Sequence, residues 1–302
     1  MAVDEPTVSI IVITYQRGAE LGRCLRSIAG QRGISSPVEV LLIDNAGDAV
    51  VEWPETPGFG IQVERPGRNL GVAGGRNLGM TLAHGDLLLF LDDDAEWGSD
   101  RTACSMVERL KSDSTAGAVA VRSVRPVSGE TILSELPHPD KDRLVHADGL
   151  TEVPYFYGVA HAIRASALKH TGVYPERYFY AMEEFDLSLR LYDAGYRIIY
   201  DPALTVIHHH AQAGRPVIGT RFWVNNARNK MRVGWRLLPL RYVLSISLIW
   251  SGRVLQKTRS PRALFSIYRS LWAERGVLRR ERRPIRPNTI RKLRAIGARL
   301  VY

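Results

Sequence analysis

The chain has 302 residues, of which 45% are hydrophobic and 24% are charged, an ordinary balance for a folded protein with a full core. Its two cysteines, Cys24 and Cys104, exclude a disulfide framework and favour a reducing compartment, and their spacing suggests no metal site. The first six residues lack the basic and apolar segments of a secretory signal, so we expect a cytoplasmic protein.

The net charge of +10 is unevenly distributed along the chain. Residues 251–302 hold fifteen lysines and arginines against two acids, Glu274 and Glu281, which gives a balance of +13. Residues 1–250 therefore carry a net charge of about −3. This distribution predicts a nearly neutral body followed by a basic tail.

Segments typical of strands and helices alternate in the first third of the chain. Residues 7–15 form a β-branched run that predicts a strand, and residues 21–28 place apolar side chains at helical spacing. A second strand is predicted at 38–43, a helix at 69–83 and a third strand at 87–91. This alternation is typical of an α/β fold with a mostly parallel sheet flanked by helices.

Polar side chains follow each of these three predicted strands. They are Thr14 and Tyr15, then Asp44 and Asn45, then Asp92, Asp93 and Asp94. Open α/β sheets bind their ligands in the crevice beyond the carboxyl ends of the strands. We therefore expect a ligand cleft at this edge of the sheet.

The three aspartates end a continuous apolar run. A sheet interior cannot hold adjacent negative charges, so the acids must lie where the strand leaves the core. Because side chains alternate along an extended chain, Asp92 and Asp94 can point to one side and Asp93 to the other. Two convergent carboxylates suit a hard divalent cation that also binds phosphate oxygens. The alternative is an acidic turn that caps the next helix.

The glycine-rich segment 69–79 precedes the acidic strand. Its glycines let the backbone approach a ligand closely, and Arg76 can neutralise a phosphate or hydrogen-bond a base. The segment matches neither a P-loop nor a dinucleotide fingerprint. A loop that only caps the following helix is the alternative.

A helix is predicted at 183–194, ending at Gly195. Its first turn carries Glu183, Glu184 and Asp186. A carboxylate at this position can act as a general base, because the helix dipole keeps it ionised. Acids in a first turn also stabilise a helix without any catalytic role, and that interpretation remains open.

Short apolar segments occupy the rest of the body, and three histidines follow the last of them. The segments lie at 118–124, 159–167, 198–200 and 206–207. We expect His208, next to the strand end, to face the same site as Asp94 as a metal ligand. A solvated histidine cluster is the alternative.

The pattern becomes helical and basic from about residue 212. Residues 237–250 are strongly apolar, but Pro239 and Arg241 interrupt them. They fall short of the roughly 18–20 uninterrupted apolar residues that span a bilayer. We therefore expect one domain at 1–212 and a helical, basic, non-spanning extension at 213–302.

In this order the motifs resemble those of the family 2 glycosyltransferases, rhamnosyltransferases among them, which have the GT-A (nucleotide-diphospho-sugar transferase) fold. The matching segments are 12–17, 42–45, 69–71 with Arg76 and Asn77, 91–95, 178–187 with Arg190, and 202–208. Residues 92–94 look like the family's Asp-x-Asp metal motif, and 183–190 are similar to its Glu-Asp-x-Asp-Leu-x-x-Arg segment. Residues 227–230 are similar to a segment often found after the catalytic domain.

The resemblance implies inverting transfer of a sugar from a UDP- or dTDP-sugar to an acceptor hydroxyl. The implied nucleotide-binding residues are Thr14, Tyr15, Asp44, Arg76 and, at the ribose, Asp93. The implied ligands of Mn²⁺ or Mg²⁺ are Asp92, Asp94 and His208. Glu184 would be the general base, although the family usually has aspartate there, and the extra methylene of glutamate changes its reach.

Other functions also fit parts of the sequence. A nucleotidyltransferase would also pair acids with a metal, but residues 14–18 match its basic glycine-rich loop poorly. A non-enzymatic basic module would use the extension to bind nucleic acid. The apolar segment beside the charge better suits an anionic membrane surface at the inner face of the membrane, and a solvated helical face remains open. The acceptor could be a glycan, a lipid-linked sugar or a small molecule, and no nucleic-acid partner is expected.

Overall fold

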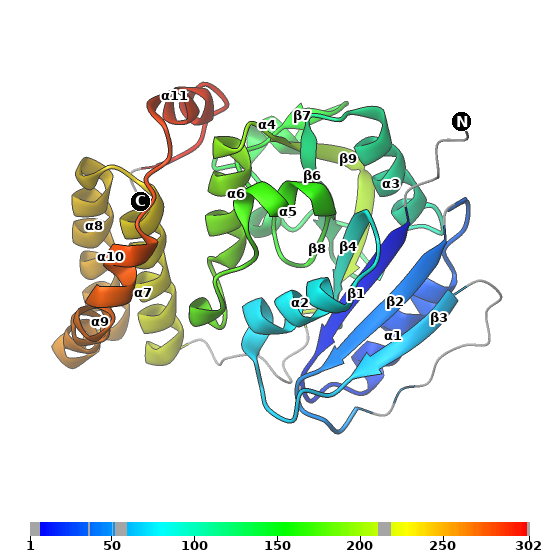
Figure 1. Cartoon of the computed structure of the whole chain (residues 1–302), viewed down its shortest axis with the longest axis horizontal. Helices are drawn as coiled ribbons and strands as arrows, with labels where there is room; N and C mark the ends of the chain where they lie inside the picture. The colour runs from blue at the N-terminus through cyan, green and yellow to red at the C-terminus, as the bar shows by residue number, and fades with distance from the viewer. Residues whose placement is uncertain (1–6, 36, 50, 52–58, 211–218, 301–302) are drawn as a thin grey trace.

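The computed structural model describes residues 7–35, 37–49, 51, 59–210 and 219–300 (Figure 1). A mixed sheet lies at the centre, helices pack on both of its faces, and a group of C-terminal helices lies beside it. The predicted α/β fold with a helical, basic C-terminal extension is confirmed.

The described residues form one nine-stranded sheet. The strands are β1 (Val8–Thr14), β2 (Val38–Asp44), β3 (Phe59–Glu64), β4 (Leu87–Asp92), β5 (Ala95–Trp97), β6 (Ala116–Val124), β7 (Thr151–Glu152), β8 (Ala160–Arg164) and β9 (Arg197–His208). Their spatial order is β3-β2-β1-β4-β8-β6-β9-β5, with β7 beside β9.

The expected parallel arrangement holds for β3, β2, β1 and β4. Beyond β4 the sheet is mixed, because β8 runs antiparallel to both β4 and β6. In the parallel part Thr14 is level with Asp44, and Ile13 is level with Asp92. The polar ends of the three predicted strands therefore meet at one edge, as the sequence indicates.

The helices of the body are α1 (Ala19–Ala29), α2 (Gly71–Leu82), α3 (Thr102–Ser112), α4 (Asp142–Val145), α5 (Ala165–Thr171) and α6 (Glu183–Asp193). Two short 3₁₀ turns lie at Leu133–Glu135 and Glu176–Tyr178. The extension contains α7 (Thr220–Leu237), α8 (Leu240–Thr258), α9 (Pro261–Ala273), α10 (Arg275–Glu281) and α11 (Pro287–Ala295).

Alternation along the strands divides the core between the two faces of the sheet. Ile10 and Val12 pack in one apolar cluster with α1 and α3. Ile11 and Phe90 point the other way, into a cluster with α2, α6 and the extension. These strands are buried on both faces, which explains why they are continuous apolar runs in the sequence.

The segments at 198–200 and 206–207 belong to a single strand, β9. Its pairing with β6 shifts register between Ala120 and Arg122, opposite the stretch of β9 that contains Pro202. A proline cannot donate a ladder hydrogen bond, so it is accommodated at such an irregularity. The interruption in the sequence is therefore a local bulge within one strand.

The predicted boundary at 212/213 lies in residues 211–218, outside the described residues. Beyond it, α7 packs against α6 on one side and against α8 and α9 on the other. Among the described helices, none combines the length and apolar character needed to cross a bilayer.

Candidate functional site

Two adjoining cavities open at the edge where the parallel strands end. The β1-side cavity, of about 150 Å³, is lined by Thr14, Tyr15, Arg17, Asn45 and the three aspartates. The α6-side cavity, of about 420 Å³, is lined by Arg76, Asp92, Glu135, Glu184 and His208. Asp92 lines both cavities, so the two form one continuous candidate site.

Arg17 neutralises the acids on the β1 side. Its Nη1 lies 2.6 Å from Asp93 Oδ1 and 2.8 Å from Asp94 Oδ2. Burial raises the pKa of Asp93 to about 7, and the Arg17 guanidinium opposes that rise. Arg17 was not among the predicted site residues, although it ends the first motif segment.

The structure brings together the three predicted metal ligands. Ligand atoms of Asp92, Asp94 and His208 all lie within 4.8 Å of one another, and His208 Nε2 is 3.4 Å from Asp94 Oδ1. The cause is the short strand β5, whose Ala95 pairs with His208 at the end of β9. Two carboxylates and an imidazole are donors that suit Mn²⁺, and carboxylates also suit Mg²⁺.

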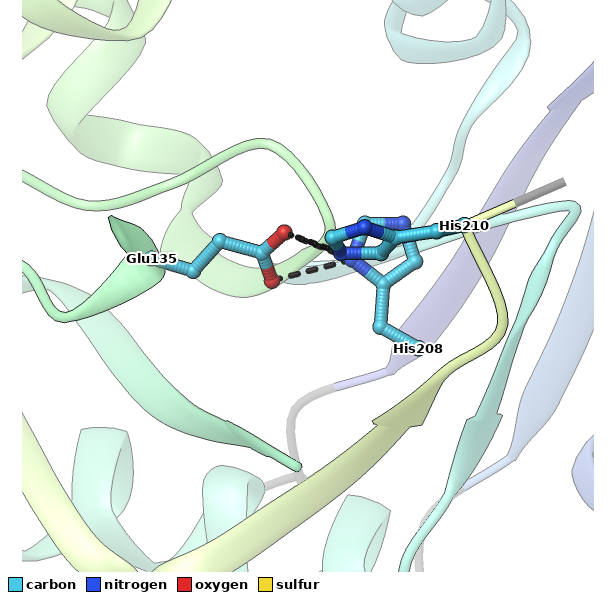
Figure 2. A group of neighbouring side chains, drawn as sticks. All are labelled: Glu135, His208 and His210. Atoms are coloured by element: carbon cyan, nitrogen blue, oxygen red, sulfur yellow. Dashed lines mark hydrogen bonds and ion pairs between the residues drawn. The ribbon is translucent and has the colours of Figure 1, made fainter. Parts of the chain in front are cut away.

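Glu135 is a member of this site that the sequence analysis missed. Its carboxylate points toward the neighbouring rings of His208 and His210, as Figure 2 shows. Both of its oxygens are 2.9 Å from His208 Nδ1, and Oε1 is 2.8 Å from His210 Nε2. His209 turns the other way, with Nε2 2.5 Å from Glu96 Oε1. Glu135 ends a short turn remote from every motif, so only the fold reveals it.

Burial and neighbouring charges shift the pKa values of His208 and Glu135. Burial lowers the pKa of His208, but hydrogen bonds to Asp94 and Glu135 outweigh that effect and raise it to about 9. Burial raises the pKa of Glu135, but contact with His208 and His210 brings it below its ordinary value. The fold therefore places His208 between two carboxylates, one at each ring nitrogen.

Arg76 is buried among the carboxylates of the α6-side cavity. Its Nη2 lies 3.1 Å from Asp92 Oδ1, and its Nη1 lies 3.3 Å from Glu183 Oε1 and 3.5 Å from Glu184 Oε1. The carbonyl of Gly158 accepts a further hydrogen bond at 2.9 Å. A Cβ at Gly158 would collide with both the Arg76 guanidinium and the Glu184 carboxylate. Arg76 thus lies away from Thr14 and Tyr15, and its predicted nucleotide contact stays a prediction.

Glu183 and Glu184 begin α6 and differ in exposure. The Glu183 side chain is 2% exposed, whereas that of Glu184 is 13% exposed in the cavity. Burial raises the pKa of both carboxyl groups, and Arg76 opposes the rise in each. Both glutamates line the α6-side cavity, and Glu184 is the more exposed of the two.

Asp44 does not line either cavity in the described structure. Its carboxylate accepts hydrogen bonds from the backbone N–H groups of Ala46, Gly47 and Ala49, and Arg65 Nε lies 3.2 Å away. Asn45, the next residue, lines the β1-side cavity with Thr14 and Tyr15. The nucleotide contact predicted for Asp44 remains a prediction.

The loop before α6 has an unusual backbone and is held by the extension. Phe179, Ala181 and Met182 all have positive φ angles, a conformation that costs non-glycine residues free energy. Buried Asn229 of α7 donates to the carbonyls of Tyr178, Tyr180 and Ala181 at 2.9, 3.0 and 2.9 Å. The extension thereby supports the segment that presents Glu184.

Comparisons with known proteins agree on one family. The family described as "Glycosyl transferase family 2" matches residues 9–172. The N-acetylglucosaminyl-diphospho-decaprenol L-rhamnosyltransferase of Mycobacterium tuberculosis is 25% identical over 282 residues, covering 79% of this chain and 89% of that protein. The pre-mycofactocin glycosyltransferase of the same organism is 28% identical over 213 residues, covering 67% of this chain and 43% of that protein.

Solved structures share the fold at low sequence identity. The mannosyltransferase PcManGT of Pyrobaculum calidifontis, in complex with GDP-Man and Mn²⁺, matches with a TM-score of 0.57 and 19% identity, over 90% of this chain and 75% of that one. GalNAc-T7 with UDP, GalNAc and Mn²⁺ matches with a TM-score of 0.61 and 18% identity. That match covers 80% of this chain, which spans half the length of the GalNAc-T7 chain.

Proposed function

Because this chain belongs to glycosyltransferase family 2 and has the GT-A fold, we propose that it moves a sugar from a UDP- or dTDP-sugar to an acceptor hydroxyl with inversion. One observation carries this proposal. Asp92 and His208 line the same cavity as Glu184, so a metal-bound diphosphate and a general base can serve one reaction centre.

The nucleotide would bind in the β1-side cavity. Thr14 and Tyr15 line it with Asn45, and Asp93 lies at its floor with Arg17. We assign contacts with the nucleotide's heterocyclic base to Thr14 and Tyr15 and contacts with its ribose to Asp93. Asn45 is a further candidate nucleotide contact because it lines the same cavity. Asp44 supports this wall through its hydrogen bonds to the following loop. Arg76 holds the neighbouring carboxylates in place.

A divalent cation fits the donor set of Asp92, Asp94 and His208. When bound, Mn²⁺ or Mg²⁺ would stabilise the negative charge on the departing nucleoside diphosphate. The complexes of two fold neighbours with Mn²⁺ support a divalent metal. The residues themselves converge from β4, from the turn after it and from β9, so the site forms only in the folded chain.

Glu184 is proposed as the general base. It would accept the proton of the acceptor hydroxyl as the oxygen attacks the sugar from the face opposite the diphosphate. Its buried neighbour Glu183 and the guanidinium of Arg76 fix its position at the start of α6. A single displacement needs one base and one leaving group, so this mechanism has no covalent enzyme intermediate.

Replacement of the base tests this assignment. Glu184→Gln keeps the size of the side chain but cannot accept the proton, so we expect turnover to fall by about 10²–10⁴-fold. The affinity for UDP and dTDP in the presence of Mn²⁺, measured by calorimetry, should change less than twofold. Wild-type turnover in the variant would refute the base. Release of pyrophosphate instead of a nucleoside diphosphate would indicate nucleotidyl transfer.

We propose a lipid-linked acceptor and an anionic membrane surface as partners. The mycobacterial rhamnosyltransferase is named for a lipid diphosphate sugar acceptor, which supports this class. The +13 charge of residues 251–302 would attract anionic lipids. Flotation with anionic and neutral liposomes across salt concentrations tests the surface, and a gel-shift assay with nucleic acid tests the alternative. Binding to neither would support a solvated face.

A further inference from the structure

A second large cavity lies within the extension, remote from the proposed chemistry. It is an open groove of about 760 Å³ bounded by α7, α8, α9 and α10; we call it the chain pocket. Its wall includes Met231, Trp235, Val243, Leu271 and Leu278. None of the described residues proposed for donor, metal or proton transfer lines it. A cavity of this size and apolar character can enclose a small apolar ligand.

Exposed apolar side chains surround the chain pocket. Phe265 and Trp272 line it and are 68% and 69% exposed. On α8, Leu240, Leu244 and Leu248 follow one another at four-residue spacing and are 58%, 72% and 77% exposed. Side chains at this spacing share one face of a helix. The pocket therefore lies within a broad apolar surface on α8 and α9, of the kind that marks an interaction site.

The charged side chains that line the pocket are cationic. Arg269, Arg275 and Arg279 line it, and no acid is found among its described lining residues. Glu274, the nearest acid along α9 and α10, is already paired with Arg232 at 2.5 Å. An apolar cavity with arginines as its only charged lining groups is complementary to an anionic amphiphile, because its chain and its phosphate need different surroundings.

We propose that the chain pocket binds one hydrocarbon chain of an anionic membrane lipid, with the lipid phosphate held by Arg269 and Arg279. This inference deepens the proposed membrane association, on which it rests, by naming the ligand and its site. A single buried chain gives only weak anchoring, and a cationic surface supplies the second contribution that stable anchoring requires. The exposed leucines of α8 would enter the bilayer surface beside the captured lipid.

Soluble probes test the pocket without a membrane. Calorimetry would compare dodecyl phosphate and dodecyl maltoside, both below their critical micelle concentrations, with inorganic phosphate. We expect dodecyl phosphate to bind at least tenfold more tightly than the other two, because only it satisfies both the apolar wall and the arginines. Equal binding of the two dodecyl compounds would overturn the role of the arginines. Equally tight binding of inorganic phosphate would overturn the role of the hydrocarbon chain.

Variants locate the binding to this cavity. Ser247 of α8 lines the pocket, so Ser247→Trp should obstruct it and weaken dodecyl phosphate binding at least tenfold. Leu248→Ser is the matched control, since Leu248 is exposed beside the pocket but does not line it, and binding should change less than twofold. Should Ser247→Trp fail to fold, the double variant Arg269→Gln, Arg279→Gln must abolish the preference for phosphate over maltoside. Unchanged binding of dodecyl phosphate to the Ser247→Trp variant would refute the proposed site.

The outcome is separable from the other proposals. Turnover of a soluble acceptor and UDP binding should be unaffected by Ser247→Trp, because the pocket lies outside the two reaction cavities. Flotation with anionic liposomes that persists when dodecyl phosphate does not bind would keep the membrane surface and reject the pocket. Sedimentation that shows a dimer, lost on Ser247→Trp, would assign this face to a second copy of the chain and overturn the lipid.

Discussion

The arginines at the edge of the sheet and those at the chain pocket have different surroundings. At the edge, Arg17 and Arg76 are buried and each is paired with carboxylates at about hydrogen-bonding distance. In the extension, Arg269 and Arg279 are exposed next to exposed apolar side chains. Buried charges held in fixed geometry serve chemistry, whereas cations displayed beside apolar surface serve association. This contrast is consistent with the proposed division, in which catalysis takes place at the edge of the sheet and docking on the extension.

Helix α7 belongs to both regions. One of its faces carries Asn229 and Arg232, which bond the loop before α6 and the carbonyl of Arg177. A neighbouring face carries Met231 and Trp235, which line the chain pocket. The division between the two regions therefore runs through a helix, along its length.

Among the site residues that sequence analysis missed, the largest effect is expected from Glu135, which supports His208. Glu135→Ala removes the carboxylate at His208 Nδ1, which orients the ring whose Nε2 faces Asp94. We expect Mn²⁺ affinity, measured by electron paramagnetic resonance with UDP present, to fall by about 10–100-fold. Glu96→Ala is the matched control, because Glu96 holds His209 on the other side. Equal losses in the two variants would show that Glu135 has no special role.

A somewhat smaller effect is expected from the hydrogen bonds that join the two regions. Asn229→Asp replaces the donating amide with a buried carboxylate facing three carbonyls, at a cost of about 2 kcal/mol or more. We expect kcat to fall by about tenfold or more, with UDP affinity unchanged, because the affected loop leads to Glu184. Asn288→Asp, on exposed α11, is the control. A normal kcat would show that these hydrogen bonds from α7 do not contribute to catalysis.

The two regions should also differ in their response to pH. Burial raises the pKa of Glu184, and the proposed base must be ionised, so kcat/KM should decline as the pH falls through a value above the ordinary glutamate pKa of about 4.3. Arginines stay protonated throughout this range, so liposome flotation should not follow the same curve. An acidic limb at the ordinary glutamate pKa would argue against Glu184 as the base.

The smallest effect is expected on the free energy of unfolding when an exposed leucine of α8 is replaced. Leu248→Ser should change the free energy of unfolding by no more than about 0.5 kcal/mol, because the side chain is exposed. Phe90→Ala, in the core behind the catalytic edge, should cost about 3–5 kcal/mol. Urea denaturation measures both. A large loss on Leu248→Ser would mean that this leucine is covered in the intact protein.

Local sequence patterns predicted the parallel half of the sheet well. The apolar run at 87–91 is buried on both faces, and its three aspartates emerge at the edge, so burial and charge both mark the strand and its end. The pairing of His208 with this edge also followed from its place after a strand. Strand β5 was not predicted, because three residues carry too little periodicity. Strand β3 and helix α3 were missed as well.

The part of the site that was missed depends on tertiary contacts. Glu135 meets His208 across 73 residues of sequence, and Asn229 meets Tyr180 across 49. No spacing rule links such residues, because their proximity results from the packing of separate elements. The position of Arg76 illustrates the same limit, since its three carboxylate partners come from β4 and α6 and could not be deduced from the glycine-rich segment that contains it.

The three carbonyl contacts of Asn229 limit where this protein can be shortened. A chain cut near residue 212 would keep every residue proposed for donor, metal and proton transfer, yet it would lose the amide that holds the strained backbone before α6. An autonomous enzyme fragment must therefore extend at least through Leu237, the last residue of α7.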